Sequence, residues 1–404
     1  MTGNRSTLFE TPLEQAFAYR LDPRHAAVAG HATSLQNLYL LERHILGFRQ
    51  AVLSGWTPSR FQREEAMHRI HEWVPEIPSP PLENLDLLDL LVAFDQIRQE
   101  QARKILPEPP LQDHLSPPLA PSPENCVEHL LHHLSRAFEP VSSLLQGLYL
   151  HGSHATRDHA GDYSDVDLVA ILAPGVATRS NALKALRNIF IRTRATLCAC
   201  DPLSHHSIQI LTAEDLLDHP QPRFPIHLLQ RARQLLPGEA PLRVGIRSED
   251  ETERLDRFWR LASSLRQLSI DRSPTMRARM VKDWMSRVML LPTLALQAIG
   301  ESVHKRESFD RSLTVFPDVD WRATDWATSH RSDWGPVPHI LRQFPNSLLL
   351  GPDLWTDLLT RMATRIADRF TPIPSPTQLD EFREISVQLS RTLVNAVLER
   401  LPKP

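Results

Sequence analysis

The stretch LYLHGSHATRDHAGDYSDVDLVAIL, residues 148–172, decides the fold predicted for this chain. An apolar segment ends in Gly152-Ser153, a polar spacer of eleven residues follows, and a second apolar segment begins with Asp165-Val-Asp167. A glycine that closes a strand lets the backbone turn sharply and approach a ligand. Side chains two apart on a strand project from the same face. The stretch therefore predicts two strands, with a bend ending the first and two carboxylates beginning the second.

The two aspartates indicate a magnesium site. Asp165 and Asp167 on one face would repel each other without a cation. The alternate residues Val166, Leu168 and Ala170 face the other way, into the core. Paired carboxylates beside a phosphate-binding turn are typical of Mg²⁺ sites, and two such ions can stabilise both oxygens of an in-line displacement. The alternative is an ordinary turn followed by a solvated strand edge.

The bend itself is a candidate phosphate site. If a helix starts at His154, its free N–H groups and its dipole point at the bend. The hydroxyl of Ser153 adds another donor. We therefore expect Gly152 and Ser153 to lie against an anionic ligand.

The pattern hydrophobic-Gly-Ser, spacer, Asp-hydrophobic-Asp-hydrophobic resembles the signature of the DNA polymerase beta-like nucleotidyltransferase superfamily, over roughly residues 125–245. The resemblance implies a small mixed sheet flanked by helices, followed by a helical domain that closes the nucleotide cleft. It implies transfer of a nucleoside monophosphate from a triphosphate, with release of pyrophosphate. It also implies that Gly152 and Ser153 hold the triphosphate and that Asp165 and Asp167 hold one or two Mg²⁺ ions.

One position departs from that pattern. Such enzymes commonly carry a third carboxylate on a later strand, and the matching segment here, residues 206–211, has Gln209 in its place. An amide offers a carbonyl oxygen but neither charge nor a base. The aspartate pair could suffice, or the domain could bind nucleotide without turnover. Otherwise another side chain must take the part of the third carboxylate, and the candidates are Asp201, Glu214, His205 and His206.

Weaker signals lie elsewhere in the chain. The resemblance makes Lys305 a candidate for the triphosphate, although a cation at a helix end needs no ligand to explain it. Cys198 and Cys200, followed by His205 and His206, could bind zinc, or the cysteines could pack in a strand.

A tryptophan-rich segment, residues 318–335, is predicted to be a loop. Its tryptophans, Trp321, Trp326 and Trp334, could stack a purine or anchor the loop to the core. Asp318 and Asp320 repeat the DxD spacing without a preceding Gly-Ser strand, so we interpret them as surface acids.

The predicted fold class is α+β: a small mixed β-sheet core of nucleotidyltransferase type, flanked by large N- and C-terminal helical regions. Clusters of proline divide the chain. The predicted parts are a helical region at 1–106, a proline-rich linker or strap at 107–124, the core at 125–245 and a C-terminal helical domain at 246–404.

The composition limits which binding partners and which cellular compartment we expect. The net charge of −3 gives no general attraction to nucleic acid or to a membrane surface. Three cysteines, no signal peptide and no apolar run long enough to span a bilayer predict a soluble, cytoplasmic protein.

The predicted function is Mg²⁺-dependent nucleotidyl transfer, with a nucleoside triphosphate as donor. AMP from ATP would pass to a hydroxyl acceptor on a small molecule or a protein, which the charge favours over nucleic acid. The alternative is a catalytically degenerate module that binds nucleotide or a protein partner without turnover.

Overall fold

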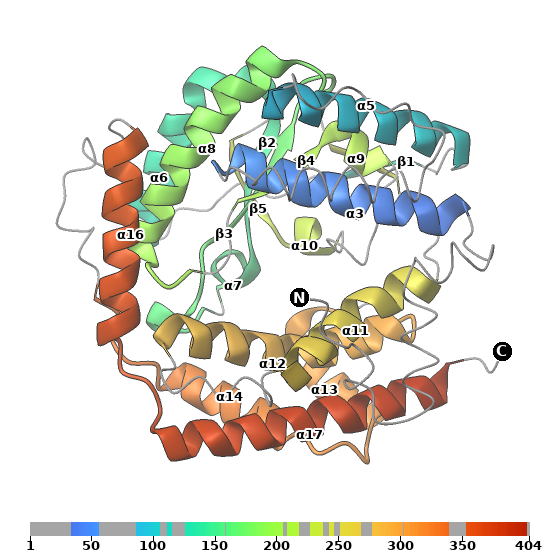
Figure 1. Cartoon of the computed structure of the whole chain (residues 1–404), viewed down its shortest axis with the longest axis vertical. Coiled ribbons are helices and arrows are strands. Elements are labelled where there is room, and N and C mark those ends of the chain that lie inside the picture. The colour runs from blue at the N-terminus through green and yellow to red at the C-terminus, as the bar shows by residue number, and fades with distance from the viewer. Residues whose placement is uncertain are drawn as a thin grey trace. The chain divides into compact units, whose positions relative to one another are not determined.

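The computed structural model describes residues 34–55, 86–105, 111–114, 126–157, 159–204, 208–217, 227–236, 242–245, 251–267, 277–301, 303–338 and 353–401 (Figure 1). These form two compact units. The sheet unit holds the described residues of 33–248 and 337–370, and the helical unit holds those of 249–336 and 371–404. The predicted α+β class, with a small mixed sheet, is confirmed. Across the described ranges, no helix has the length and apolar character needed to cross a membrane.

The sheet unit is built on four strands in the order β4-β3-β2-β5. Their bounds are β2 Leu145–His151, β3 Asp167–Leu172, β4 Gln209–Thr212 and β5 Arg233–Leu236. Strand β3 runs parallel to β4 and antiparallel to β2, which is also antiparallel to β5. A parallel pair needs a long crossover, and helix α8, Ser180–Cys200, supplies it between β3 and β4.

The two faces of this sheet are covered differently. On one face, Leu168, Ala170 and Leu172 pack in a core with helix α8 and helix α6, Cys126–Phe138. This confirms that the apolar residues alternating with the aspartates are buried. Val169 and Ile171 lie on the other face, in a smaller cluster that includes Leu242 and Val244.

Several short elements complete the sheet unit. They are η3 Glu139–Leu144, α7 Gly152–Thr156, η4 Gly161–Tyr163, α9 Ala213–Leu217 and α10 His227–Gln230. A separate two-stranded sheet pairs β1, Leu111–His114, with β6, Leu242–Gly245. Part of the predicted proline-rich strap therefore forms a short strand.

Two N-terminal helices pack against the sheet unit's core (Figure 1). They are α3, Ser34–Leu53, and α5, Leu87–Ile105. Helix α3 contacts β4, the edge strand, and contributes side chains to the clusters on both faces of the sheet: Leu41 and Ile45 to one, and Leu46 to the other. Helix α16, Asp353–Phe370, packs against α8 in the same unit.

The helical unit consists of α11 Glu251–Gln267, α12 Ala278–Ala298, α13 Lys305–Val315, α14 Arg322–Ser332 and α17 Pro376–Arg400. Helix α12 contacts the other four. It continues through Pro292, although a proline inside a helix removes one backbone hydrogen bond. The tryptophan-rich segment is largely helix α14 and not a loop, because buried Ala323 and Ala327 recur at helical spacing with no Gly or Pro between them.

Candidate functional site

The Gly-Ser bend and the aspartates come together because β2 and β3 are antiparallel neighbours. His151, the last residue of β2, pairs in register with Asp167, the first residue of β3. Gly152 follows with φ +70°, a conformation that favours glycine. A Cβ built on Gly152 would collide with Oδ2 of Asp167 and lie 3.3 Å from its Cγ. The bend and this carboxylate are therefore in direct contact.

The short helix α7 begins at Gly152 itself, two residues earlier than predicted. Ser153 is consequently inside its first turn, where its carbonyl accepts the backbone N–H of Arg157. Asp165 precedes β3 and is 8% exposed, while Asp167 is half-buried. Within the described ranges, no lysine or arginine forms an ion pair with Asp167.

His154 lies close enough to both acids to interact with them electrostatically, and it was not singled out from the sequence. Burial lowers the pKa of its ring, and the neighbouring His159 lowers it further, against the opposite effect of Ser164 and of both carboxylates. Nε2 lies 3.4 Å from the carbonyl oxygen of Ser164, and the ring stacks on His159 at 4.7 Å. A neutral His154 leaves the negative charge of Asp165 and Asp167 available to a cation. Its position directly after Gly-Ser was the one available sequence signal.

Two arginines lie near the bend. Arg157 ends α7 in the left-handed conformation, with φ 62°, and Arg233 pairs with Leu150 in the β2–β5 ladder. Burial lowers the pKa of Arg233, and the positive charge of Arg157 lowers it further. No carboxylate among the described residues pairs with either guanidinium. Two neighbouring like charges favour an anionic ligand.

Gln209 occupies the face of the sheet that carries Asp167. It pairs in register with Val169, two residues after Asp167, and it is half-buried. The two acids considered as substitutes for a third carboxylate have other contacts. Asp201 is the C-cap residue of helix α8, and its side chain accepts the N–H of Leu203 at 3.0 Å. Glu214 accepts the N–H of Gly175 at 2.7 Å.

The zinc hypothesis is not tested, because His205 and His206 lie outside the described residues. Cys198 and Cys200 end helix α8, so the alternative that they pack in a strand is wrong. Among the described residues, no three His, Cys, Asp or Glu side chains are grouped so that they could hold a metal ion. A cation at the candidate site would therefore take two protein carboxylates and complete its shell with other ligands.

The remaining candidates belong to the helical unit. Lys305 is the first residue of α13, and its assignment to the triphosphate stays a prediction. Trp326 stacks on Phe382 at 4.0 Å and on His330 at 3.6 Å, which is the packing expected of an anchor. Asp320 pairs with Arg322 at 2.6 Å, as expected of a surface acid.

Comparisons with protein-family models, with curated proteins and with solved structures gave no match to this chain. The function is therefore inferred from the geometry of the site.

Proposed function

We propose that the chain is a Mg²⁺-dependent nucleotidyltransferase of the DNA polymerase beta-like type, using Asp165 and Asp167 to bind the metal and a nucleoside triphosphate. The observation that carries the proposal is the contact between Gly152 and Asp167. A bend able to take phosphate and a carboxylate able to take a cation lie side by side, although fifteen positions separate them in the chain. ATP is the default donor, and a hydroxyl on a small molecule or protein is the acceptor.

The residues present fit Mg²⁺. This ion is commonly held by one or two carboxylates together with substrate phosphates and water, and so needs no cage made wholly of protein. The absence of a Cβ at Gly152 leaves the room beside Oδ2 of Asp167 that such a shared ligand shell requires. When bound, Mg²⁺ would offset the charge of the triphosphate and polarise the phosphorus–oxygen bonds.

The chain's own residues have distinct parts in this proposal. Asp165 and Asp167 hold the cation, while Ser153 and the arginine pair, Arg157 and Arg233, bind phosphate oxygens. Arginine suits this role because its planar donors match phosphate geometry and its charge is permanent. Together these residues fix the α-phosphate for attack by the acceptor, and positioning of this kind accounts for most of the catalysis in phosphoryl transfer.

A second candidate function is nucleotide binding without turnover. It is favoured by Gln209, which places an amide on the face of the sheet that carries Asp167. An amide cannot take the proton of an acceptor hydroxyl at neutral pH. In this case the chain would bind nucleotide and Mg²⁺ but release no pyrophosphate.

One experiment separates the two candidates. The protein is incubated with Mg²⁺, α-labelled ATP and a cell extract, and both transferred label and pyrophosphate are measured. The Asp165→Asn and Asp167→Asn variants keep the shape of each side chain and remove its charge. Asp318→Asn is the matched control, because Asp318 has the same DxD spacing at an exposed site in the helical unit. Transfer lost in the first two variants alone supports the enzyme, whereas Mg²⁺-dependent binding without pyrophosphate supports the second candidate.

A further inference from the structure

The strand that carries Gln209 is the edge of the four-stranded sheet. One side of β4 pairs with β3, which leaves the backbone groups on its other side in need of partners. Helix α3 contacts β4 through two consecutive residues: Gln50 bonds to backbone groups at this edge, and Arg49 binds Asp215, which bonds to β4.

Gln50 satisfies the free edge directly. Its Oε1 accepts the backbone N–H of Ile210 at 3.0 Å, and its Nε2 donates to the carbonyl of Ile208. The two bonds enclose Gln209, the residue between them, so one side-chain amide replaces the missing strand at this position. The backbone of Gln209 is thereby held from both sides, by β3 and by α3.

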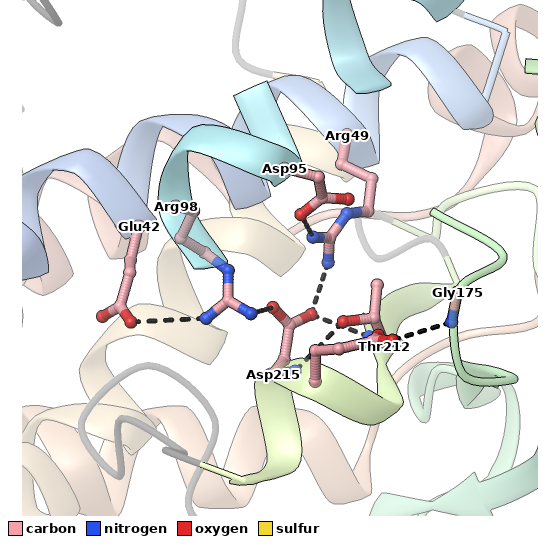
Figure 2. Close-up of polar contacts among 8 residues, drawn as sticks. Glu42, Arg49, Asp95, Arg98, Gly175, Thr212 and Asp215 are labelled. Carbon is pink, nitrogen blue, oxygen red and sulfur yellow. Dashed lines mark hydrogen bonds and ion pairs between the residues drawn. The ribbon is translucent and has the colours of Figure 1, made fainter. Parts of the chain in front are cut away.

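Arg49 fixes the other end of β4 through Asp215 of helix α9 (Figure 2). Asp215 accepts the N–H of Thr212, the last residue of β4, at 2.7 Å, and its own N–H donates to Oγ1 of Thr212 at 3.0 Å. The guanidinium of Arg49 lies between Asp215 and Asp95 of α5 and binds both (Figure 2). All three charged side chains are 3% exposed or less.

A second arginine extends this buried cluster. Arg98 of α5 lies 3.4 Å from Asp215 and 3.6 Å from Glu42 of α3. The cluster therefore joins α3, α5 and α9, with three carboxylates around two guanidiniums. Separating a buried charge from its ionic partners is costly, so the arrangement tolerates little movement.

We infer that Gln50 and Arg49 are positioning residues that hold β4, and with it Gln209, in place beside Asp167. The helix pair α3–α5 is then a working part of the site and not a separate module for binding partners. We call the contacts that Gln50 and Arg49 make at this edge the clamp on β4. The clamp itself follows from the contacts above, while its effect on ligand binding rests on the proposed function.

The test uses the full chain and the variant Gln50→Met, which keeps the length of the side chain. It removes the hydrogen bonds to Ile208 and Ile210, together with the one that Nε2 donates to Oγ of Ser54 within α3. The matched control is Arg187→Ala. Arg187 Nε donates to the carbonyl of Val52, so this variant also loosens α3, but at a bond that does not touch β4. Two quantities are measured: the hydrogen-exchange rate of the Ile210 amide, and the affinity for Mn²⁺ with ATP, by electron paramagnetic resonance.

We expect Gln50→Met to speed exchange at Ile210 about tenfold and to weaken Mn²⁺·ATP binding about fivefold, since a buried donor loses its partner. Arg187→Ala should leave both quantities within about twofold of the wild type, because its lost bond lies away from the strand. Unchanged exchange at Ile210 in Gln50→Met would overturn the clamp. Faster exchange with unchanged Mn²⁺·ATP affinity would overturn the positioning role.

The same measurements separate this inference from the proposed function. If the wild type and Asp167→Asn bind Mn²⁺·ATP equally well, the proposed function fails, and with it the effect of β4 on ligand binding. Exchange at Ile210 needs no nucleotide, so it would still confirm or overturn the clamp by itself.

Discussion

Gly152 and Asp167 lie so close together that a single carbon added to the glycine would collide with a carboxylate oxygen of the aspartate. The contact follows from the register of β2 and β3, in which His151 pairs with Asp167. It joins the bend that we assign to phosphate with the acid that we assign to Mg²⁺.

Gly152→Ala should therefore lower the affinity for Mg²⁺·ATP strongly and the free energy of unfolding only moderately. The added methyl group would push Asp167 away from the bend, and we expect Mg²⁺·ATP affinity to fall more than tenfold. A glycine with positive φ costs about 1 kcal/mol or more of unfolding free energy when replaced by alanine. Isothermal titration and urea unfolding measure the two effects.

Gly175→Ala is the matched control for that variant. Gly175 has φ +68°, against +70° for Gly152, but a Cβ built there meets no atom within 4 Å. Both variants should lose similar stability from the backbone, while Gly175→Ala should keep its affinity for the nucleotide. Equal loss of affinity in the two variants would show that the contact with Asp167 has no special role.

Arg157→Gln should weaken the binding of ATP about tenfold, the value expected for the loss of one charge-assisted hydrogen bond. We further assign Arg157 to the β- and γ-phosphates, which AMP lacks, so AMP should bind almost as before. Competition titrations with ATP and AMP measure the difference. Arg136, an exposed arginine of α6, provides the control Arg136→Gln. A similar loss of affinity for ATP and AMP would contradict the assignment.

The buried cluster predicts an asymmetry between two of its carboxylates. Burial raises the pKa of Asp95, which has one direct arginine partner, more than Arg49 lowers it. Burial acts in the same sense on Asp215, but Arg49, Arg98 and the N–H of Thr212 outweigh it and hold the pKa of Asp215 at about 2.

Asp215→Asn should accordingly cost about 3 kcal/mol of unfolding free energy, since it neutralises the one carboxylate that both buried guanidiniums share. Asp95→Asn should cost less than about 1 kcal/mol, because its oxygen can still accept from Arg49. Urea unfolding measures both variants. Equal costs would mean that Arg49 and Arg98 do not act chiefly through Asp215.

The depressed pKa of Asp215 also predicts the acid sensitivity of the sheet unit. Its stabilising contribution is complete above the ordinary value of 3.8 and is lost as the pH falls toward about 2. The wild type should lose about 2 kcal/mol more than Asp215→Asn across that interval. Unfolding free energies in urea at several pH values measure this, and parallel curves for the two proteins would refute it.

The sequence predicted the parts of the fold whose patterns are local. The two apolar segments on either side of the polar spacer indicate β2 and β3, which the structure places at Leu145–His151 and Asp167–Leu172. The close contact between Gly152 and Asp167 was also predictable, because Gly-Ser ends one strand and the two aspartates begin the next.

Other features depend on segments that meet only after folding. Arg233 reaches the bend through the pairing of β5 with β2, and no local pattern indicates that pairing. Arg49 offered a signal that was missed: it lies four residues after Ile45, within the apolar stripe of α3. A charge in such a stripe indicates a buried partner, but not which one.

The most direct test of the site is the calorimetric titration of the full chain with ATP, with and without Mg²⁺, alongside Asp167→Asn and Asp318→Asn. We expect Mg²⁺ to be required for tight binding, Asp167→Asn to abolish the requirement together with most of the affinity, and Asp318→Asn to match the wild type. Binding that is the same with and without Mg²⁺, or the same in Asp167→Asn as in the wild type, would contradict the proposed site.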